Sequence, residues 1–287
     1  MNGNHSTGAP STGAPSTGAS ITGASPSGAT PSGASAEVLL QARNLTKRFG
    51  GLAANHDISL DLWRDRIHAV IGPNGAGKST LTNLLSGDLV PTSGTVTLGG
   101  HDITGHPPFE ISRLGLGRSY QKTNIFLPLT VEENVRLAAQ SRQRHRPWDP
   151  RRWMDVATAS SVIRERTERA LALSGLAGRR AAIAGACSHG EQRQLEIAMT
   201  LATEPLVLLL DEPLAGMGVA EAEKMVELLL RLKKDHAMML VEHDMDAVFA
   251  LADHLTVMVN GQVIASGTPQ AIRSDAAVQA AYLGEEH

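Results

Sequence analysis

The segment Gly72-Pro73-Asn74-Gly75-Ala76-Gly77-Lys78-Ser79 is the strongest indication of the fold class, because it matches the phosphate-loop pattern G-x-x-x-x-G-K-[ST]. Glycines at these places let the backbone curl so that successive N–H groups point inward at a phosphate. The apolar run 67–71 precedes the loop as a predicted strand, and residues 79–85 follow it as a predicted helix that stops at Gly87. The N-terminus of that helix adds partial positive charge. The stretch therefore predicts a nucleotide-binding loop.

Two side chains of this loop carry the chemistry that a bound nucleotide requires. Lys78 places a point charge beside the β- and γ-phosphates, and the Ser79 hydroxyl suits Mg²⁺, which prefers octahedral oxygen ligands. The residues expected to contact the nucleotide are Gly72, Pro73, Asn74, Gly75, Ala76, Gly77, Lys78, Ser79 and Thr80.

A pair of carboxylates ends the continuous apolar run 206–210, which is typical of a strand covered on both faces. Asp211 and Glu212 should therefore lie at the carboxyl edge of a sheet, where open α/β folds bind ligands. We expect Asp211 to hold Mg²⁺ through water, and Glu212 to orient and deprotonate an attacking water. His243 follows a second apolar run, 237–241, and is expected beside the same site, where it can sense the γ-phosphate.

The rest of the chain predicts an α/β domain. Strands are expected at 58–62 and 95–98, a capping box starts a helix at Thr130, and Asn260-Gly261 suits the tight turn of a hairpin over 257–264. A helical apolar stripe comprises Met225, Leu228, Leu229 and Leu232. Strands that alternate with helices imply a mainly parallel sheet, and the early strands and the late hairpin suggest an additional antiparallel layer.

Composition sets limits on the protein class. The chain has 287 residues, a net charge of -3 and one cysteine, so it can bury a large core, shows no general attraction for nucleic acid, and fits a reducing compartment. No run approaches the ~18–20 apolar residues of a membrane span. Residues 1–36 repeat a Ser-Thr-Gly-Ala-Pro unit and predict a disordered tail without the features of a secretory or transit signal.

One more element distinguishes the family. Between the phosphate loop and the switch Glu242-His243-Asp244 lies Cys187-Ser188-His189-Gly190-Glu191, in the place of the Leu-Ser-Gly-Gly-Gln signature of ABC ATPases. The chain resembles these ATPases from about residue 38 to its C-terminus. The resemblance implies a phosphate-loop NTPase domain of ABC type over 37–287, with a mainly parallel core, an antiparallel β layer and a helical subdomain at about 126–186.

The resemblance also implies roles for single residues. Phe49 lies where an aromatic ring stacks on the adenine of ATP, and Gln121 matches the glutamine that contacts Mg²⁺ and the water. Ser188 and Gly190 match the signature positions that touch the γ-phosphate bound by the other subunit. Lys78, Gln121, Glu212 and His243 are then the catalytic set, and each site requires two chains in a head-to-tail dimer closed by ATP.

This sequence departs from the family pattern at four positions. Cys187, His189 and Glu191 replace Leu, Gly and Gln in the signature, and Gly218 stands where many relatives have Asp. The loop around Gly218 crosses the dimer interface in the family. A heterodimer with a second, different ATPase subunit is one explanation for these departures.

The closer resemblance is to the longer of the two Liv-type ATPase subunits of importers for branched-chain, hydrophobic amino acids. It rests on 47–54, 192–198, 212–216, 241–244 and the ending 281–285, with an insertion near 141–157. It implies a peripheral subunit on the cytoplasmic face of the inner membrane. The implied partners are two integral-membrane permeases, a second ATPase subunit and, indirectly, a substrate-binding protein, with no nucleic acid.

Other functions share these marks and stay open at this point. Importers of urea, amides or aromatic acids and the lipopolysaccharide exporter have ATPases of the same type. A soluble, non-transport ABC ATPase is a remote alternative, since this chain has one phosphate loop and no long heptad run. The insertion interleaves Arg142, Arg144, Arg146, Arg151 and Arg152 with Trp148 and Trp153, which fits a solvated elaboration or contact with a membrane partner.

Overall fold

The computed structural model describes residues 37–120, 124–142 and 152–283. The predicted tail 1–36, Gln121 and most of the insertion near 141–157 lie outside the described residues. The strands are β1 (Val38–Phe49), β2 (Leu52–Trp63), β3 (Ile67–Ile71), β4 (Ser93–Leu98), β5 (His101–Asp102), β6 (Leu116–Arg118), β7 (Val207–Asp211), β8 (Ala237–Val241), β9 (His254–Val259) and β10 (Gln262–Gly267). The helices are α1 (Lys78–Leu85), α2 (Pro108–Leu114), α3 (Val131–Ser141), α4 (Arg152–Leu173), α5 (His189–Leu201), α6 (Val219–Leu232), α7 (Met245–Leu251), α8 (Pro269–Arg273) and α9 (Ala276–Leu283), with 3₁₀ turns at Ala177–Arg179 and Ala184–Ala186.

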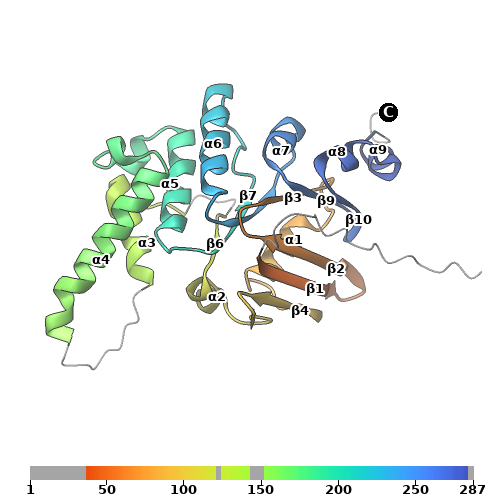
Figure 1. Ribbon diagram of the computed structural model, residues 1–287, viewed down its shortest axis with the longest axis horizontal. Coiled ribbons are helices and arrows are strands. Elements are labelled where there is room, and N and C mark those ends of the chain that lie inside the picture. The colour runs from red at the N-terminus through yellow and green to blue at the C-terminus, as the bar shows by residue number, and fades with distance from the viewer. Residues whose placement is uncertain (1–36, 121–123, 143–151, 284–287) are drawn as a thin grey trace, which may run out of the picture. The chain divides into compact units, whose positions relative to one another are not determined.

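The strands form two sheets, as Figure 1 shows. The larger sheet has the order β10-β9-β3-β8-β7-β6, and all its neighbouring strands run parallel except β9 and β10. The smaller sheet, β2-β1-β4-β5, is antiparallel. This arrangement confirms the predicted fold class of a mainly parallel core with an antiparallel layer.

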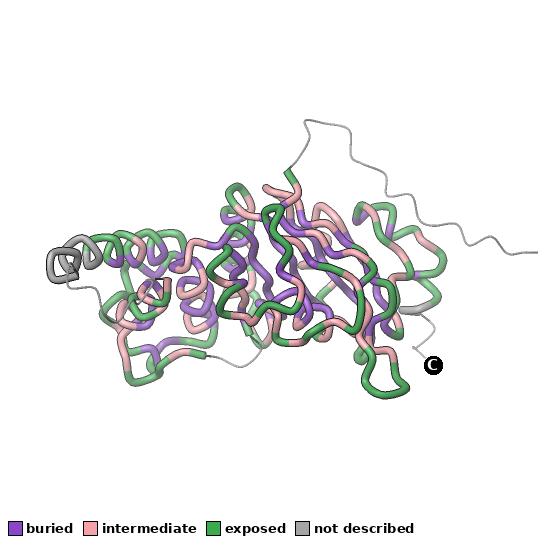
Figure 2. Tube along the Cα trace, turned by 90° about the horizontal axis from the view of Figure 1, so that it is seen from below, coloured by how far each residue is buried: buried purple, intermediate pink, exposed green. Residues whose placement is uncertain are grey.

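Both faces of the larger sheet are covered at its centre, which explains why β3, β7 and β8 are buried along their whole length. Alternate residues of β7 enter different cores: Leu208 and Leu210 face the helices α3 to α7, whereas Val207 and Leu209 face α1 and the antiparallel sheet. Figure 2 shows buried residues following these strands through the interior. With both faces covered, ligands can reach the sheet only at the ends of its strands. The loops of the site lie at the carboxyl ends of the strands.

The predicted hairpin forms but lies in the larger sheet and not in the antiparallel layer. Asn260 and Gly261 have φ values of 49° and 76°, as the tight turn between β9 and β10 requires. β9 pairs with β3 in parallel, and its residues 255–258 are buried. Because residues on both faces of β9 are buried, β9 fits inside the sheet, and β10 is the strand at its edge.

Helices α3 and α4 lie in the part of the chain expected to form a helical subdomain, about 126–186, and they pack on each other and on α5, which follows that range. The capping box predicted at Thr130 is present: its hydroxyl accepts from the Glu133 N–H, and the Glu133 carboxylate accepts from the Thr130 N–H at 2.8 Å. Among the described residues, no helix combines the length and apolarity that a bilayer crossing demands.

Two histidines join three strands in the interior. His68 Nε2 lies 2.8 Å from the Thr256 hydroxyl, and its Nδ1 lies 3.2 Å from the Asp61 carbonyl oxygen. The His254 ring is 4.7 Å away, edge to face. Burial, together with the neighbouring His254, lowers the pKa of His68 to about 3. His68 is therefore neutral in the folded protein at every physiological pH.

This neutral histidine should make stability depend on pH. The unfolded chain gains a proton on His68 below its ordinary pKa of about 6.5, and the folded chain does not, so the free energy of unfolding falls as the pH drops. Urea denaturation should show about 1.4 kcal/mol more loss between pH 7.5 and 5.5 in the wild type than in His68→Gln. Equal losses in both proteins would remove His68 as the titrating group.

Candidate functional site

The phosphate loop, the acidic pair and the histidine switch leave the parallel sheet at one edge. Val70 of β3 is in register with Val241 of β8, and Val241 is in register with Asp211 of β7. The Glu212 N–H donates to the Val241 carbonyl oxygen at 2.9 Å. The segments that follow these three strands therefore start side by side, although they lie far apart in the sequence.

The loop requires glycine at two positions for lack of space. A Cβ on Gly77, which has φ 98°, would lie 2.5 Å from the Ala54 carbonyl oxygen, and one on Gly72 would lie 2.2 Å from the Met258 carbonyl oxygen. Contacts this short do not occur for real side chains. Neighbouring strands β2 and β9 thus enclose the loop, and the helix α1 begins directly after it.

Lys78 is folded back over the loop. Its Nζ donates to the carbonyl oxygens of Gly72 at 2.6 Å and Pro73 at 3.1 Å. Burial lowers the pKa of Lys78, whereas the carboxylates of Glu212 and Asp211 raise it. Lys78 therefore interacts with the loop carbonyls by hydrogen bonds and with the carboxylates of Glu212 and Asp211 by charge.

Asp211 is the buried acid of the pair, with 2% of its surface exposed. Its N–H donates to the Ser119 hydroxyl at 3.2 Å, while its Oδ1 is buried without a hydrogen-bond partner in the protein. Burial raises the pKa of Asp211, and the positive charges of Arg118 and Lys78 lower it. A buried carboxylate oxygen that lacks a donor fits a cation ligand, directly or through water.

Glu212 and His243 lie at the more open part of the site. Glu212 adopts a left-handed φ of 49°, which turns the chain sharply after β7, and the His243 side chain is 67% exposed. Between them, the buried Glu242 carboxylate accepts from the Leu214 N–H at 3.0 Å and from the His243 N–H at 3.2 Å. Burial raises the pKa of Glu242.

Glu242 thus positions both segments, a role that sequence reasoning missed. The available signal was a carboxylate that directly follows the continuous apolar run 237–241. Asp244 has a separate structural role, because its carboxylate caps α7 by accepting from the N–H groups of Asp246 and Ala247.

Phe49 stands at the tip of the β1–β2 hairpin with 51% of its surface exposed. The ammonium of Lys47 lies 5.2 Å from the centroid of its ring. The strand that follows reaches the phosphate loop, where the Asn55 side chain donates to the Gly77 carbonyl oxygen at 3.3 Å. An exposed ring on a hairpin anchored to the loop is free to contact a planar base.

Ser188 and Gly190 lie at the start of helix α5, and the contacts described for them are within α5 and with α6, not with the phosphate loop. Ser188 is the N-cap, and its hydroxyl accepts from the Glu191 N–H at 3.2 Å. The Glu191 carboxylate accepts from the Ser188 N–H and pairs with Arg179 at 2.9 Å. Glu191, one of the departures from the family pattern, is therefore accommodated by a complete capping box.

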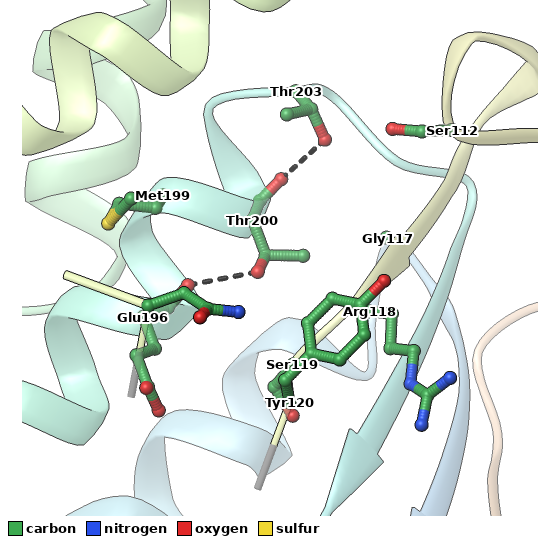
Figure 3. A pocket seen from close by; sticks show the side chains of 10 residues that line it. Ser112, Gly117, Arg118, Ser119, Tyr120, Glu196, Met199, Thr200 and Thr203 are labelled. Carbon is green, nitrogen blue, oxygen red and sulfur yellow. Dashed lines mark hydrogen bonds between the residues drawn. The ribbon is translucent and has the colours of Figure 1, made fainter. Parts of the chain in front are cut away.

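Gln121 lies outside the described residues, but the segment before it borders a pocket between β6 and α5, seen in Figure 3. The Tyr120 carbonyl oxygen accepts from the Arg193 guanidinium at 3.3 Å, and Arg193 forms a buried ion pair with Glu196 at 2.8 Å. The pocket is lined by Ser112, Gly117, Arg118, Ser119, Tyr120, Asn124, Glu196, Met199, Thr200 and Thr203. Helix α5 is thus tied directly to the chain that leads into Gln121.

This fold and this sheet edge define a cassette-type ATPase, and comparison with known families agrees. The family described as "ABC transporter" matches residues 55–215. The chain belongs to the ABC transporter family, as an ATP-binding and ATP-hydrolysing member of it. A second family, described as "Branched-chain amino acid ATP-binding cassette transporter", matches residues 262–287. The predicted resemblance to ABC ATPases and to their Liv-type members is confirmed.

Individual relatives align with this chain along almost their full lengths. The chain is 38% identical over 255 residues to the high-affinity branched-chain amino acid transport ATP-binding protein BraF of Pseudomonas aeruginosa, covering 86% of this chain and 98% of that protein. It is 36% identical over 253 residues to LivG of Escherichia coli, covering 87% and 99%. A crystal structure of a nucleotide-free ATP-binding cassette from an ABC transporter matches with a TM-score of 0.74 and 30% identity, covering 87% of this chain and all of the other. A cassette in its ADP conformation matches equally well.

Proposed function

We propose that this chain is the ATPase subunit of an importer for branched-chain, hydrophobic amino acids. The observation that carries the proposal is the match of residues 262–287 to the branched-chain amino acid family, at the C-terminal end where the shared ATPase engine is not encoded. The proteins named BraF and LivG support it, because they align along 98% and 99% of their lengths. The subunit acts at the cytoplasmic face of the inner membrane.

In this proposal the loop binds ATP as Mg-ATP. Lys78 exchanges its loop carbonyls for the β- and γ-phosphates, and Phe49 stacks on the adenine. Ser79, Asp211 and Gln121 hold Mg²⁺, a role that the partnerless buried oxygen of Asp211 fits. Bound Mg²⁺ supplies neutralisation of charge on the transferring phosphoryl group.

Hydrolysis then depends on the residues that follow β7 and β8. Glu212 orients the attacking water and accepts its proton, while His243 contacts the γ-phosphate. Glu242 fixes both through their backbones, since it binds the N–H of His243 and the N–H of Leu214, two residues after Glu212. Glu242 thereby fixes the positions of the Glu212 segment and of His243 relative to each other.

The second half of each site comes from another ATPase subunit. Ser188 and Gly190 of one chain contact the γ-phosphate bound by the other, so ATP closes a head-to-tail dimer. Gly218 caps α6 without a side chain, where many relatives have Asp, and we propose a second, different ATPase subunit opposite this one. The conformational change on ATP binding passes to two permeases through the pocket between β6 and α5, which Tyr120 lines.

Purification of the tagged full-length chain from its native membranes in mild detergent tests this function, with mass spectrometry of the co-purifying proteins. We expect two small permeases and a second, shorter ATPase. The substrate-binding protein that works with these permeases should then bind leucine, isoleucine or valine in a ligand screen. Lipopolysaccharide-export permeases, ribosomes or DNA in the purified complex would contradict the import of amino acids, and a binding protein specific for urea or amides would change the cargo.

A further inference from the structure

The N-terminus of α5 already holds a negatively charged group of its own chain. The Ser188 hydroxyl donates to Oε1 of Glu221 at 2.8 Å, across from α5 to the first turn of α6. The two residues are 33 positions apart, so the contact is tertiary. A carboxylate at a helix N-terminus is favoured by the unpaired N–H groups and the partial positive charge there.

The Glu221 carboxylate also lies directly against the backbone of Gly190. A Cβ at Gly190 would be 2.8 Å from both Cδ and Oε1 of Glu221. Gly190 has no positive φ, and the atoms nearest to it belong to the flexible end of the Glu221 side chain, so only the position of that carboxylate fills the space beside Gly190. The absent side chain leaves room for an anion to approach the start of α5, and Glu221 fills that room.

The segment that carries Glu221 also passes close to His189, the first residue of α5. A Cβ at Gly216, which has φ 74°, would lie 3.3 Å from Cε1 of His189. The chain from Glu212 to Glu221 therefore runs past all three residues Ser188, His189 and Gly190. The hydrogen bond between Ser188 and Glu221 therefore links the position of this segment to access at the N-terminus of α5.

We propose that Glu221 is an internal competitor for the anion site formed by Ser188 and Gly190. The inference rests on the proposed function, in which these two residues receive the γ-phosphate bound by the opposite subunit. The carboxylate and the phosphate cannot both accept from the Ser188 hydroxyl and lie on Gly190. ATP-driven closure must therefore displace Glu221, which raises the ATP concentration that closure needs and keeps the empty dimer open.

Steady-state ATP hydrolysis by the purified complex, with this chain at full length, tests the competition. Glu221→Ala removes the carboxylate, and we expect the half-saturating ATP concentration to fall about three- to tenfold, with kcat changed less than twofold. Glu223→Ala is the matched control, because it removes the same charge from an exposed position on the same helix. It should behave as the wild type.

The outcomes separate the inference from the function on which it rests. Equal half-saturation in Glu221→Ala and wild type, or a higher value or a collapse of kcat in Glu221→Ala, overturns the competitor role and leaves the ATPase intact. A wild-type complex without ATP hydrolysis overturns the proposed function itself. A double-mutant cycle of Ser188→Ala and Glu221→Ala in urea denaturation of the nucleotide-free chain should show coupling between the two residues. Additive losses would overturn the contact.

Discussion

Glu212→Gln should reduce single-turnover phosphate release from ATP bound to this chain by about 100- to 10,000-fold, the range that loss of a general base produces. Glutamine keeps the volume and backbone of glutamate but cannot take a proton from water. Glu212 belongs to the cluster that includes Lys78 and Asp211, so the change also removes one negative charge beside the phosphates. ATP should bind at least as tightly as in the wild type, and the ATP-bound dimer should accumulate.

The measurement combines rapid-quench phosphate release with light scattering of the chain and its co-purifying subunits in Mg-ATP. Glu227→Gln provides the control, since it makes the same charge change on the exposed side of α6. Brisk phosphate release by Glu212→Gln would exclude Glu212 as the base. Slow phosphate release without accumulation of a dimer would show that Glu212 acts in catalysis but that bound ATP does not hold the two ATPase subunits together.

Sequence reasoning placed the parallel core because local signals and tertiary structure agree there. The apolar runs before Gly72, Asp211 and His243 are strands within one residue of the predicted bounds, since strands buried on both faces must be apolar throughout. The loop residues could be predicted for a similar reason: the pattern of glycines reports a backbone shape that only glycine allows.

The missed features depend on contacts between distant segments. Nothing in the hairpin 257–264 indicates which sheet it joins, because its turn signal is local and its pairing with β3 spans nearly 190 residues. The Ser188–Glu221 contact likewise has no periodic or motif signature. Glu242 could have been suspected, since a carboxylate after a buried strand requires donors, but its donor Leu214 N–H is 28 residues away.

Lys78→Met should weaken ATP binding by about 10- to 100-fold, because hydrogen bonds to charged groups contribute about 1.5–3 kcal/mol and about 1.4 kcal/mol corresponds to tenfold. Methionine keeps the length of the side chain and removes its charge. Lys224→Met, on the exposed face of α6, is the control for the loss of one lysine. Titration calorimetry with Mg-ATP on the full-length chain measures the effect, and wild-type affinity in Lys78→Met would exclude the lysine from phosphate binding.

The same variant should leave the nucleotide-free fold nearly as stable as the wild type. Lys78 gives two hydrogen bonds to the loop carbonyls, but burial opposes its charge, and the lowered pKa records that opposition. Removing this half-buried ammonium together with its hydrogen bonds therefore has two opposing effects on stability. In the proposed function, phosphates replace the carbonyl partners of Lys78, so the loss of the lysine should appear in the affinity for ATP and not in the urea midpoint.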